Sequence, residues 1–263
     1  MKTKLIAVAA ALCLISCGQT SDEPKVYTLV QYNVGAFHKY VEDGIPPVVD
    51  VVKELEADAL TLNEVDSCAT RTGGVNQLAE FARLMGGWHH LFAKAMPFQG
   101  GGYGVGVASA PELKVLNEYT VPLSRYDGHE PRALAVVEYE DFVLCSTHLD
   151  LTENSQIGQI QEINTFINKI YADKPVILGG DFNCRPGSAP YELMKLNWQV
   201  LSRGTESFPS TNPDRCIDYF FGRPAGKVLK VISTRVPRKL ENSDVTISSD
   251  HLPLVVTISI ANQ

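Results

Sequence analysis

The sequence predicts an α/β protein in which two mostly antiparallel sheets pack face to face and helices lie outside. Strand-like and helix-like segments are mixed along the whole chain. Short β-prone segments between residues 88 and 149 follow one another like hairpins, and helical segments bracket them. A chain of 263 residues, 44% of them hydrophobic, can bury a substantial core as one domain. Periodicity alone leaves other layered α/β arrangements open.

Four elements are expected before residue 86. Residues 26–33 alternate between the two faces as a strand does, and residues 59–65 form a second, buried strand. Residues 46–57 carry three valines and a leucine at helical spacing. Residues 75–85 place a leucine, a phenylalanine, an alanine and a methionine on one helical face. The predicted order is therefore strand, helix, strand, helix.

The rest of the chain is predicted to be mostly strands around one long helix. Isoleucines recur on one stripe of residues 153–171, which is the clearest amphipathic helix. Residues 100–102, three glycines, read as a flexible turn before a strand. The expected strands are residues 88–92, 104–108, 113–121, 133–139, 142–149, 176–178, 217–221, 228–233 and 252–260. No repeat or second domain boundary interrupts this pattern.

The charge balance of the chain is acidic. The formal net charge is -7, and removing the first sixteen residues, with Lys2 and Lys4, gives -7 - 2 = -9. Proteins that hold duplex nucleic acid non-specifically are usually basic, because neutralising phosphates drives that binding. The composition therefore argues against a dedicated DNA-binding surface.

The N-terminus is predicted to be a targeting segment. Two lysines precede an apolar stretch that is too short to span a membrane comfortably. Residues 14–17 resemble a bacterial lipobox, in which Cys17 becomes the lipidated first residue; an ordinary secretory signal cut elsewhere is the alternative. The expected organisation is a signal peptide over residues 1–16, a tether over 17–25 and one domain over 26–263. That domain would lie at the bacterial cell envelope, facing the periplasm or the exterior.

Four cysteines would remain in an oxidising compartment after processing: Cys68, Cys145, Cys184 and Cys216. Cys184 follows one polar motif directly, and Cys216 lies two residues before another. If those motifs converge, the two thiols come within bridging range. We therefore expect a Cys184–Cys216 disulfide, with two buried free thiols as the alternative. None of the four has the close pairing of a zinc site.

Polar residues gather where apolar, β-prone runs of the second half end. A chain leaving a sheet delivers such side chains to one rim. Ionisable groups placed in this way predict a functional site. The residues are His148, Asp181, Asn183, Asp218, Asp250 and His251.

Six short motifs resemble those of the endonuclease/exonuclease/phosphatase superfamily and occur in its order. They span essentially the whole mature domain, and six in order are much more specific than any one tripeptide. The resemblance implies a four-layer, deoxyribonuclease I-like α/β sandwich with its active site at one end and a divalent metal, usually magnesium. The motifs are Tyr32-Asn33-Val34, Leu62-Asn63-Glu64-Val65, Ser146-Thr147-His148-Leu149, Gly180-Asp181-Phe182-Asn183, Ile217-Asp218-Tyr219 and Ser249-Asp250-His251.

The resemblance also implies a metal site. Glu64 would be the principal ligand, with Asn33 and Asp250 near the same cation. Hard oxygen ligands suit Mg²⁺, which takes only one or two protein carboxylates, and Mn²⁺ is the alternative metal. The other reading of Glu64 is an acid at a strand end paired with a surface lysine. Asn63 departs from the family pattern, which commonly has glutamine there.

The remaining motif residues are assigned to the reaction by the same resemblance. His251 would be the general base or polarise the attacking water, with Asp218 fixing its tautomer. Asp181 and Asn183 would position the water and the phosphate, and His148 would donate to a phosphate oxygen. The structural alternatives are turn residues for Asp181 and Asp218 and packing for His251.

Three functions are compatible with these residues. The first is a surface-anchored, metal-dependent phosphodiesterase or phosphatase, and the second is a nuclease for which nucleic acid is only a substrate. The third is a catalytically silent binding lipoprotein. The acidic balance and the lack of a basic cluster near the motifs favour the first. Arg132 could contact substrate phosphate, or pair with Glu130 or Glu138. Nothing suggests assembly, so we expect a monomer that meets the membrane only through its lipid.

Overall fold

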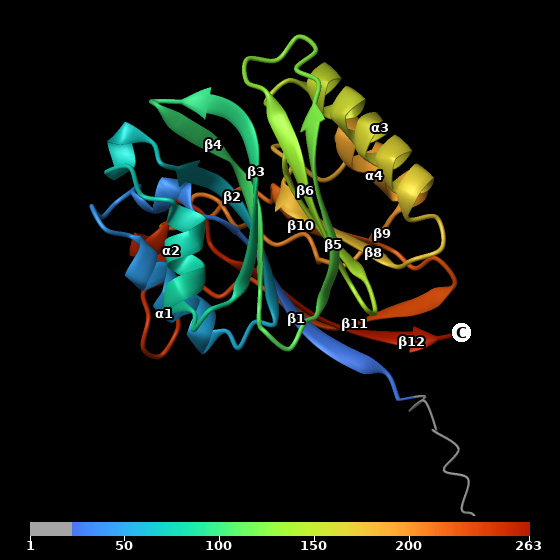
Figure 1. Cartoon of the computed structure of the whole chain (residues 1–263). Helices are drawn as coiled ribbons and strands as arrows, with labels where there is room; N and C mark the ends of the chain where they lie inside the picture. Colours follow the sequence, from blue (N-terminus) through green and yellow to red (C-terminus); the bar gives the residue numbers. More distant parts are fainter. Residues whose placement is uncertain (1–22) are drawn as a thin grey trace, which may run out of the picture.

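The computed structural model describes residues 23–263 (Figure 1). Two six-stranded sheets form its centre, as predicted. In the first sheet β1 pairs in parallel with β2, and its other pairs are antiparallel. Its order is β11 (Lys227–Arg235), β12 (Leu254–Asn262), β1 (Lys25–Asn33), β2 (Ala59–Ser67), β4 (Gly101–Ser109) and β3 (His89–Phe98).

The second sheet repeats this design. Only β7 and β8 run parallel, and the other pairs are antiparallel. Its order is β5 (Val115–Leu123), β6 (Arg132–Tyr139), β7 (Val143–His148), β8 (Val176–Asp181), β10 (Asp218–Arg223) and β9 (Gln199–Val200).

Helices cover the outer face of each sheet. Helices α1 (Ile45–Glu54) and α2 (Gln77–Leu84) lie on the first sheet, and α3 (Glu153–Ile170) and α4 (Ala189–Asn197) lie on the second (Figure 1). The remaining helical pieces are η1 (Gly35–Phe37), η2 (Thr70–Thr72) and α5 (Val245–Ser248). The layers therefore run helix, sheet, sheet, helix. Within the described residues, no helix is long and apolar enough to cross a membrane.

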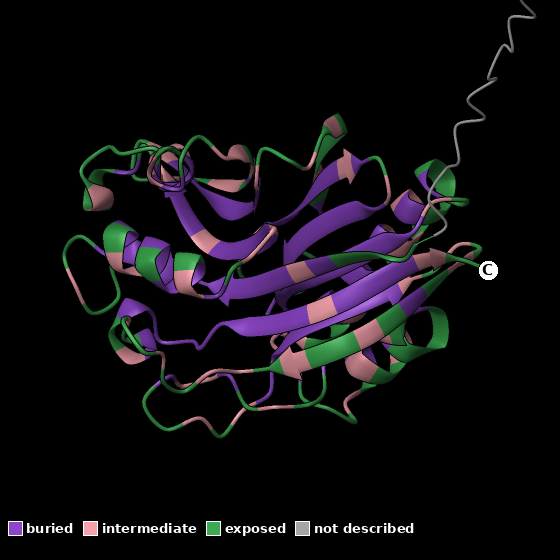
Figure 2. Ribbon diagram, turned by 90° about the horizontal axis from the view of Figure 1, so that it is seen from below, coloured by how far each residue is buried: buried purple, intermediate pink, exposed green. Residues whose placement is uncertain are grey.

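Three apolar clusters hold these layers together. One lies between the sheets and includes Leu29, Leu144 and Phe220, and each of the other two joins a sheet to its helices. Buried residues concentrate in the strands, while exposed residues lie on loops and outer helix faces (Figure 2). Burial on both faces explains why several strands read as continuous apolar runs rather than alternating ones.

The elements differ from the sequence predictions mainly at their ends. Helix α4 was missed because it buries only Pro190 and Met194 and so carries no apolar stripe. Gly101 and Gly102 were expected in a turn but begin β4. A side chain at Gly101 would put its Cβ 2.2 Å from the carbonyl oxygen of Ser67, so close strand packing requires a glycine there.

The two parallel pairs decide where the site lies. Strands β1 and β2 end side by side, with Asn33 level with Asn63, and β7 and β8 end with His148 level with Asp181. Strand β10 runs antiparallel to β8, so its first residue, Asp218, stands opposite Asp181. Strand ends of both sheets therefore bring the predicted residues to one end of the sandwich.

Candidate active site

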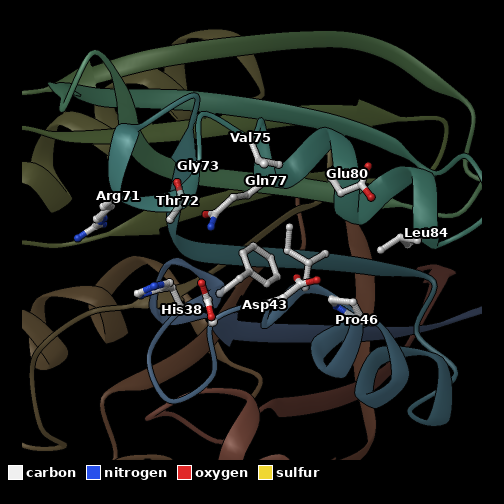
Figure 3. A pocket seen from close by; sticks show the side chains of 13 residues that line it. His38, Asp43, Pro46, Arg71, Thr72, Gly73, Val75, Gln77, Glu80 and Leu84 are labelled. Carbon is white, nitrogen blue, oxygen red and sulfur yellow. The ribbon is translucent and has the colours of Figure 1, made fainter.

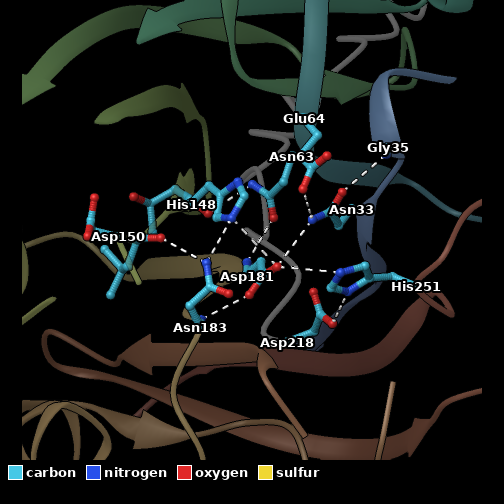
Figure 4. Close-up of polar contacts among 12 residues, drawn as sticks. Asn33, Gly35, Asn63, Glu64, His148, Asp150, Asp181, Asn183, Asp218 and His251 are labelled. Atoms are coloured by element: carbon cyan, nitrogen blue, oxygen red, sulfur yellow. Dashed lines mark hydrogen bonds and ion pairs between the residues drawn. The ribbon is translucent and has the colours of Figure 1, made fainter. Parts of the chain in front are cut away.

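Every predicted residue of the catalytic and metal sets lies at this end of the sandwich (Figure 4). Six of them, all except Asn33 and Asp218, line one cleft with a volume of about 430 Å³. It is lined by Glu64, Tyr103, Glu130, Arg132, His148, Leu151, Asp181, Asn183, Phe208, Arg215, Ile217, Asp250 and His251. Residues from separate parts of the sequence thus face a single space.

A buried row of two carboxylates and one imidazole forms the floor of the cleft. His251 Nδ1 lies 2.8 Å from Asp218 Oδ2, and His251 Nε2 lies 3.6 Å from Asp181 Oδ2. All three side chains are at most 5% exposed. Asp218 fixes the orientation of the ring, and the second ring nitrogen faces Asp181.

The charges in this row determine the protonation of His251. Burial alone lowers the pKa of this imidazole, but the facing Asp218 and the charges of Asp181 and Asp250 outweigh it and raise the pKa to about 9. His251 is therefore an imidazolium near neutral pH. An imidazolium donates hydrogen bonds, so in this state His251 can donate to a phosphate oxygen, whereas the predicted role as general base requires the neutral ring.

Asp181 is the group that titrates near neutral pH. Burial and the charge of Asp218 raise its pKa from 3.8 to about 7. The Asn183 backbone N–H donates to Asp181 Oδ1 at 2.9 Å, and the Asn33 amide donates to Oδ2 at 3.1 Å. A carboxylate held in this way, with a pKa near the working pH, suits a general base.

His148 is neutral and faces the same cleft. Burial, followed by the positive charges of Arg132 and His251, lowers its pKa well below the ordinary value. Its Nε2 lies 2.9 Å from Asn183 Nδ2 and 3.7 Å from Asp181 Oδ2. Its Nδ1 is buried and has no hydrogen-bond partner among the described residues. Nε2 is therefore the ring nitrogen that meets the polar groups Asn183 and Asp181.

The three predicted metal ligands lie beside this row. Glu64 sits at a bulge of β2 with φ 57°, which turns its carboxylate out of the strand pattern. The Asn33 amide donates to Glu64 Oε1 at 3.0 Å. Asp250 forms a 2.7 Å ion pair with Lys39, and the charges of Asp250 and Glu64 both raise the pKa of that lysine.

These oxygens fit a hard divalent cation. Glu64 and Asp250 supply two carboxylates to one cleft, and they already attract the ammonium of Lys39. Mg²⁺ prefers a site with only one or two carboxylates and enough space for its bound water molecules. Asp181, Asp218 and His251 also bring ligand atoms within 4.8 Å of one another, but there the imidazolium already balances the acids. We therefore place the metal-binding potential at Glu64 and Asp250.

Arg132 is buried in the wall of the cleft. It is only 5% exposed, and its Nε has no hydrogen-bond partner among the described residues. Its guanidinium approaches Glu130 at 3.4 Å, whereas Glu138 pairs with Lys174 at 2.7 Å. A buried guanidinium with a free donor is suited to an oxyanion ligand. Arg132 thus forms the expected ion pair with Glu130 and also lines the cleft.

Buried residues that the sequence analysis did not select form hydrogen bonds to the site residues. Gln31 is fully buried and donates to Asp218 Oδ1 at 3.1 Å and to Asn63 Oδ1 at 2.6 Å. Ser207 donates to Asp218 Oδ2 at 2.5 Å, and Asn63 Oδ1 also accepts the Asp181 N–H at 2.8 Å. The available signal was a glutamine inside an otherwise apolar strand. The departure at Asn63 thus has a structural role between the two sheets.

Phe208 lines the cleft next to the catalytic histidine. Its ring centroid is 4.6 Å from that of His251, and the Arg215 guanidinium lies over the Phe208 ring at 4.2 Å from the centroid. Phe208 thus forms part of the wall of the cleft. Tyr219 does not reach the cleft, because its hydroxyl donates to the Cys184 and Cys216 carbonyls.

A second hollow of about 480 Å³ lies apart from these residues (Figure 3). It separates the segment around His38 and Asp43 from the segment around Arg71 and Gln77. Although it is slightly larger than the cleft, it contains none of the predicted site residues. Volume alone therefore does not identify the reactive site in this protein.

The predicted disulfide is not formed. Cys184 and Cys216 are both free and buried. Both pack in the apolar cluster beneath α3 and α4, and burial raises the pKa of each thiol. The expectation of a bridge was wrong because two motifs can converge while their cysteines serve as apolar packing. Cys17, the predicted lipidation site, lies outside the described residues.

Comparisons with known proteins agree with this geometry. The model of the endonuclease/exonuclease/phosphatase family matches residues 30–251. No curated protein matches the sequence significantly.

Solved structures show the same fold at low sequence identity. An endonuclease/exonuclease/phosphatase from Bacteroides vulgatus is 17% identical with a TM-score of 0.73, over 89% of this chain and 98% of that one. A mannosyl-6-phosphatase from Bacteroides thetaiotaomicron is 14% identical with a TM-score of 0.71, over 89% and 99%. The catalytic domain of human nocturnin, with a bound sulfate anion, is 18% identical with a TM-score of 0.68, over 91% and 97%.

Proposed function

Since the chain belongs to the endonuclease/exonuclease/phosphatase family, whose members are mostly hydrolases of phosphate esters, we propose that it is a Mg²⁺-dependent phosphodiesterase or phosphatase. Mn²⁺ is the alternative metal and would support the same reaction. The observation that carries this proposal is the buried row of Asp218, His251 and Asp181 in the cleft that Arg132 also lines. One cleft thus offers a base, a cationic donor and an anion-binding arginine.

The substrate phosphate is held by positive donors. Attack on phosphorus increases negative charge on the phosphate oxygens, so fixed donors there stabilise the transition state. The Arg132 guanidinium and the His251 imidazolium both line the cleft and supply this charge. Because Asp218 holds the imidazolium in place, this donor needs little reorganisation during the reaction.

Asp181 takes the proton of the attacking water. Its pKa of about 7 keeps a large fraction of it ionised at neutral pH and lets it accept a proton there. The Asn183 N–H donates to Asp181 Oδ1, and the Asn33 amide donates to Asp181 Oδ2. These two hydrogen bonds fix the orientation of the Asp181 carboxylate. When bound by Glu64, Asp250 and Asn33, Mg²⁺ would act as a Lewis acid that neutralises charge on the phosphate.

The acidic surface favours small or lipid-linked phosphate esters over nucleic acid. The net charge of -7 gives no general attraction for a polyanion, and the cleft balances its two arginines with acids. Nucleic acid enters this proposal only as an alternative substrate. A binding lipoprotein without activity is a remote alternative, because all catalytic positions are present and oriented.

The proposal also places the protein at the cell envelope as a monomer. The support is the lipobox-like sequence ending at Cys17, followed by a short polar tether. Lipid attachment would keep the cleft of a folded domain close to a membrane without inserting it. Cys17→Ala should release the protein from the membrane fraction, and retention of that variant would contradict lipid anchoring.

A substrate panel tests the proposed activity. Turnover of a generic phosphodiester, a phosphomonoester, choline phospholipids, and single- and double-stranded DNA would be measured with Mg²⁺, with Mn²⁺ and with a chelator. The proposal predicts chelator-sensitive hydrolysis of small or lipid-linked esters. Faster cleavage of DNA than of any small ester would identify the nuclease instead, and chelator-resistant hydrolysis would refute metal dependence.

A further inference from the structure

Lys39 is the only cation that pairs with the predicted metal ligands in the described part of the chain. Its Nζ lies 2.7 Å from Asp250 Oδ2. Glu64 forms no ion pair within residues 23–263. The ammonium of Lys39 therefore neutralises one of the two predicted metal-binding carboxylates directly.

An unusual turn brings Lys39 to this place. Gly35, Ala36 and Phe37 all have left-handed backbone angles, with φ of 51°, 54° and 49°. A Cβ at Gly35 would lie 3.1 Å from Lys39 Cβ and 3.3 Å from Asp250 Oδ1, so glycine leaves the room in which they meet. Such strained segments persist only where the surrounding structure holds them, and they cluster at functional sites.

The base of the turn is held by hydrogen bonds from buried or backbone donors, whereas the Lys39 side chain is partly exposed to solvent. The buried Gln77 amide donates to the Ala36 carbonyl, and the Gly44 N–H donates to the Phe37 carbonyl at 2.9 Å. By contrast, the Lys39 side chain is 45% exposed. A lysine on a flexible four-carbon stem can leave such a position at little cost.

Lys39 and a divalent cation require the same oxygen atoms. The Lys39 ammonium pairs with Oδ2 of Asp250, and Asp250 is one of the two carboxylates that are suited to bind Mg²⁺. Two cations a few ångströms apart repel each other, so binding of one weakens binding of the other.

We propose that Lys39 is a built-in competitor of the metal, which neutralises Asp250 in the metal-free protein and is displaced when the metal binds. Lys39 thereby sets the affinity of the site for divalent cations. This inference rests on the proposed function, because it takes Asp250 and Glu64 to be the metal-binding carboxylates. It assigns Lys39 as a positioning residue that holds the metal-free site in shape.

Calorimetric titration of the metal-free protein with Mn²⁺ tests the competition directly. Lys39→Met should bind Mn²⁺ about fivefold more tightly than the unsubstituted protein, the factor expected for a half-exposed ion pair. Lys25→Met is the matched control, because Lys25 forms a similar 2.8 Å pair with Asp141 away from the cleft. The control should bind Mn²⁺ with unchanged affinity. Equal or weaker binding by Lys39→Met would overturn the proposal.

Thermal unfolding gives a second readout that a merely structural lysine would not produce. In a chelator, Lys39→Met and Lys39→Gln should unfold at a lower temperature than the unsubstituted protein, because Asp250 loses its counter-ion. Mn²⁺ should then raise the unfolding temperature more in these variants than in the unsubstituted protein, and an equal or smaller rise would contradict the competition. If the unsubstituted protein binds no divalent metal, the proposed function itself fails; if it binds metal and the variants bind no tighter, only the assignment of Lys39 fails.

Discussion

Asp218→Asn should reverse the protonation state of His251. The substitution removes a carboxylate that lies 2.8 Å from Nδ1 and keeps the shape of the side chain. Asp218 supplies the strongest of the interactions that raise the pKa of His251 to about 9, whereas burial acts in the opposite direction. Without that charge, the burial effect dominates and the pKa should fall below its ordinary value of 6.5.

The size of the effect follows from the two pKa values. A change from about 9 to 6.5 corresponds to about 3 kcal/mol of lost preference for the imidazolium. If the imidazolium donates to the phosphate, the rate at pH 7.5 should fall at least about tenfold, because a histidine with a pKa of 6.5 is only about one-tenth protonated at that pH, whereas one with a pKa of about 9 is almost fully protonated. The alkaline limit of the activity profile should also move from near pH 9 to below neutral pH.

A proton NMR titration of the histidine rings in the metal-free protein measures this change. His251→Gln identifies the His251 signal among the six histidines. Asp141→Asn, which removes a carboxylate paired with Lys25, is the control and should leave the His251 titration unchanged. A His251 signal that still titrates near pH 9 in Asp218→Asn would refute the electrostatic account.

Three further substitutions test the stability of the site and its frame, each by urea unfolding in a chelator. Asp181→Asn should stabilise the protein by about 2–4 kcal/mol at pH 8. The carboxyl has a pKa raised from 3.8 to about 7 in the folded protein, so the folded state loses stability as the pH rises through that range. The stabilisation by Asp181→Asn should therefore be smaller at pH 5, and a difference that does not change with pH would contradict this cause. Gln31→Leu should destabilise by about 2 kcal/mol, because it leaves a buried oxygen of Asp218 without its donor, and no loss would show that the network is dispensable. Gly180→Ala should cost about 3 kcal/mol or more, because its Cβ would lie 2.1 Å from the Thr147 carbonyl oxygen, and a neutral effect would show that β7 and β8 can separate.

The sequence predicts the site well where a residue's position depends on its own strand. His148, Asp181 and Asp218 stand at strand ends, and the pairing of those strands brings them together. The two-sheet architecture is what the resemblance of the six ordered motifs to the family implies, since periodicity alone left other layered arrangements open. These features depend on local pattern and on connectivity, both of which a single sequence records.

The features that were missed depend on contacts between distant segments. Gln31 is recognisable as functional only once the two sheets face each other, because its partner Asp218 is 187 residues away. Lys39 reaches Asp250 only through three consecutive left-handed residues, which side-chain patterns do not predict. The protonation of His251 depends on how many buried carboxylates surround it, and this appears only in three dimensions.

Hydrolysis of the preferred ester in ¹⁸O-labelled water tests the central claim most directly, because it follows the oxygen that attacks phosphorus. With Mg²⁺, the product phosphate should gain one labelled oxygen and the alcohol none, and both the chelator and Asp181→Asn should stop the incorporation. Label in the alcohol, or incorporation that persists in the chelator or in Asp181→Asn, would contradict a metal-dependent attack of water on phosphorus with Asp181 as the base.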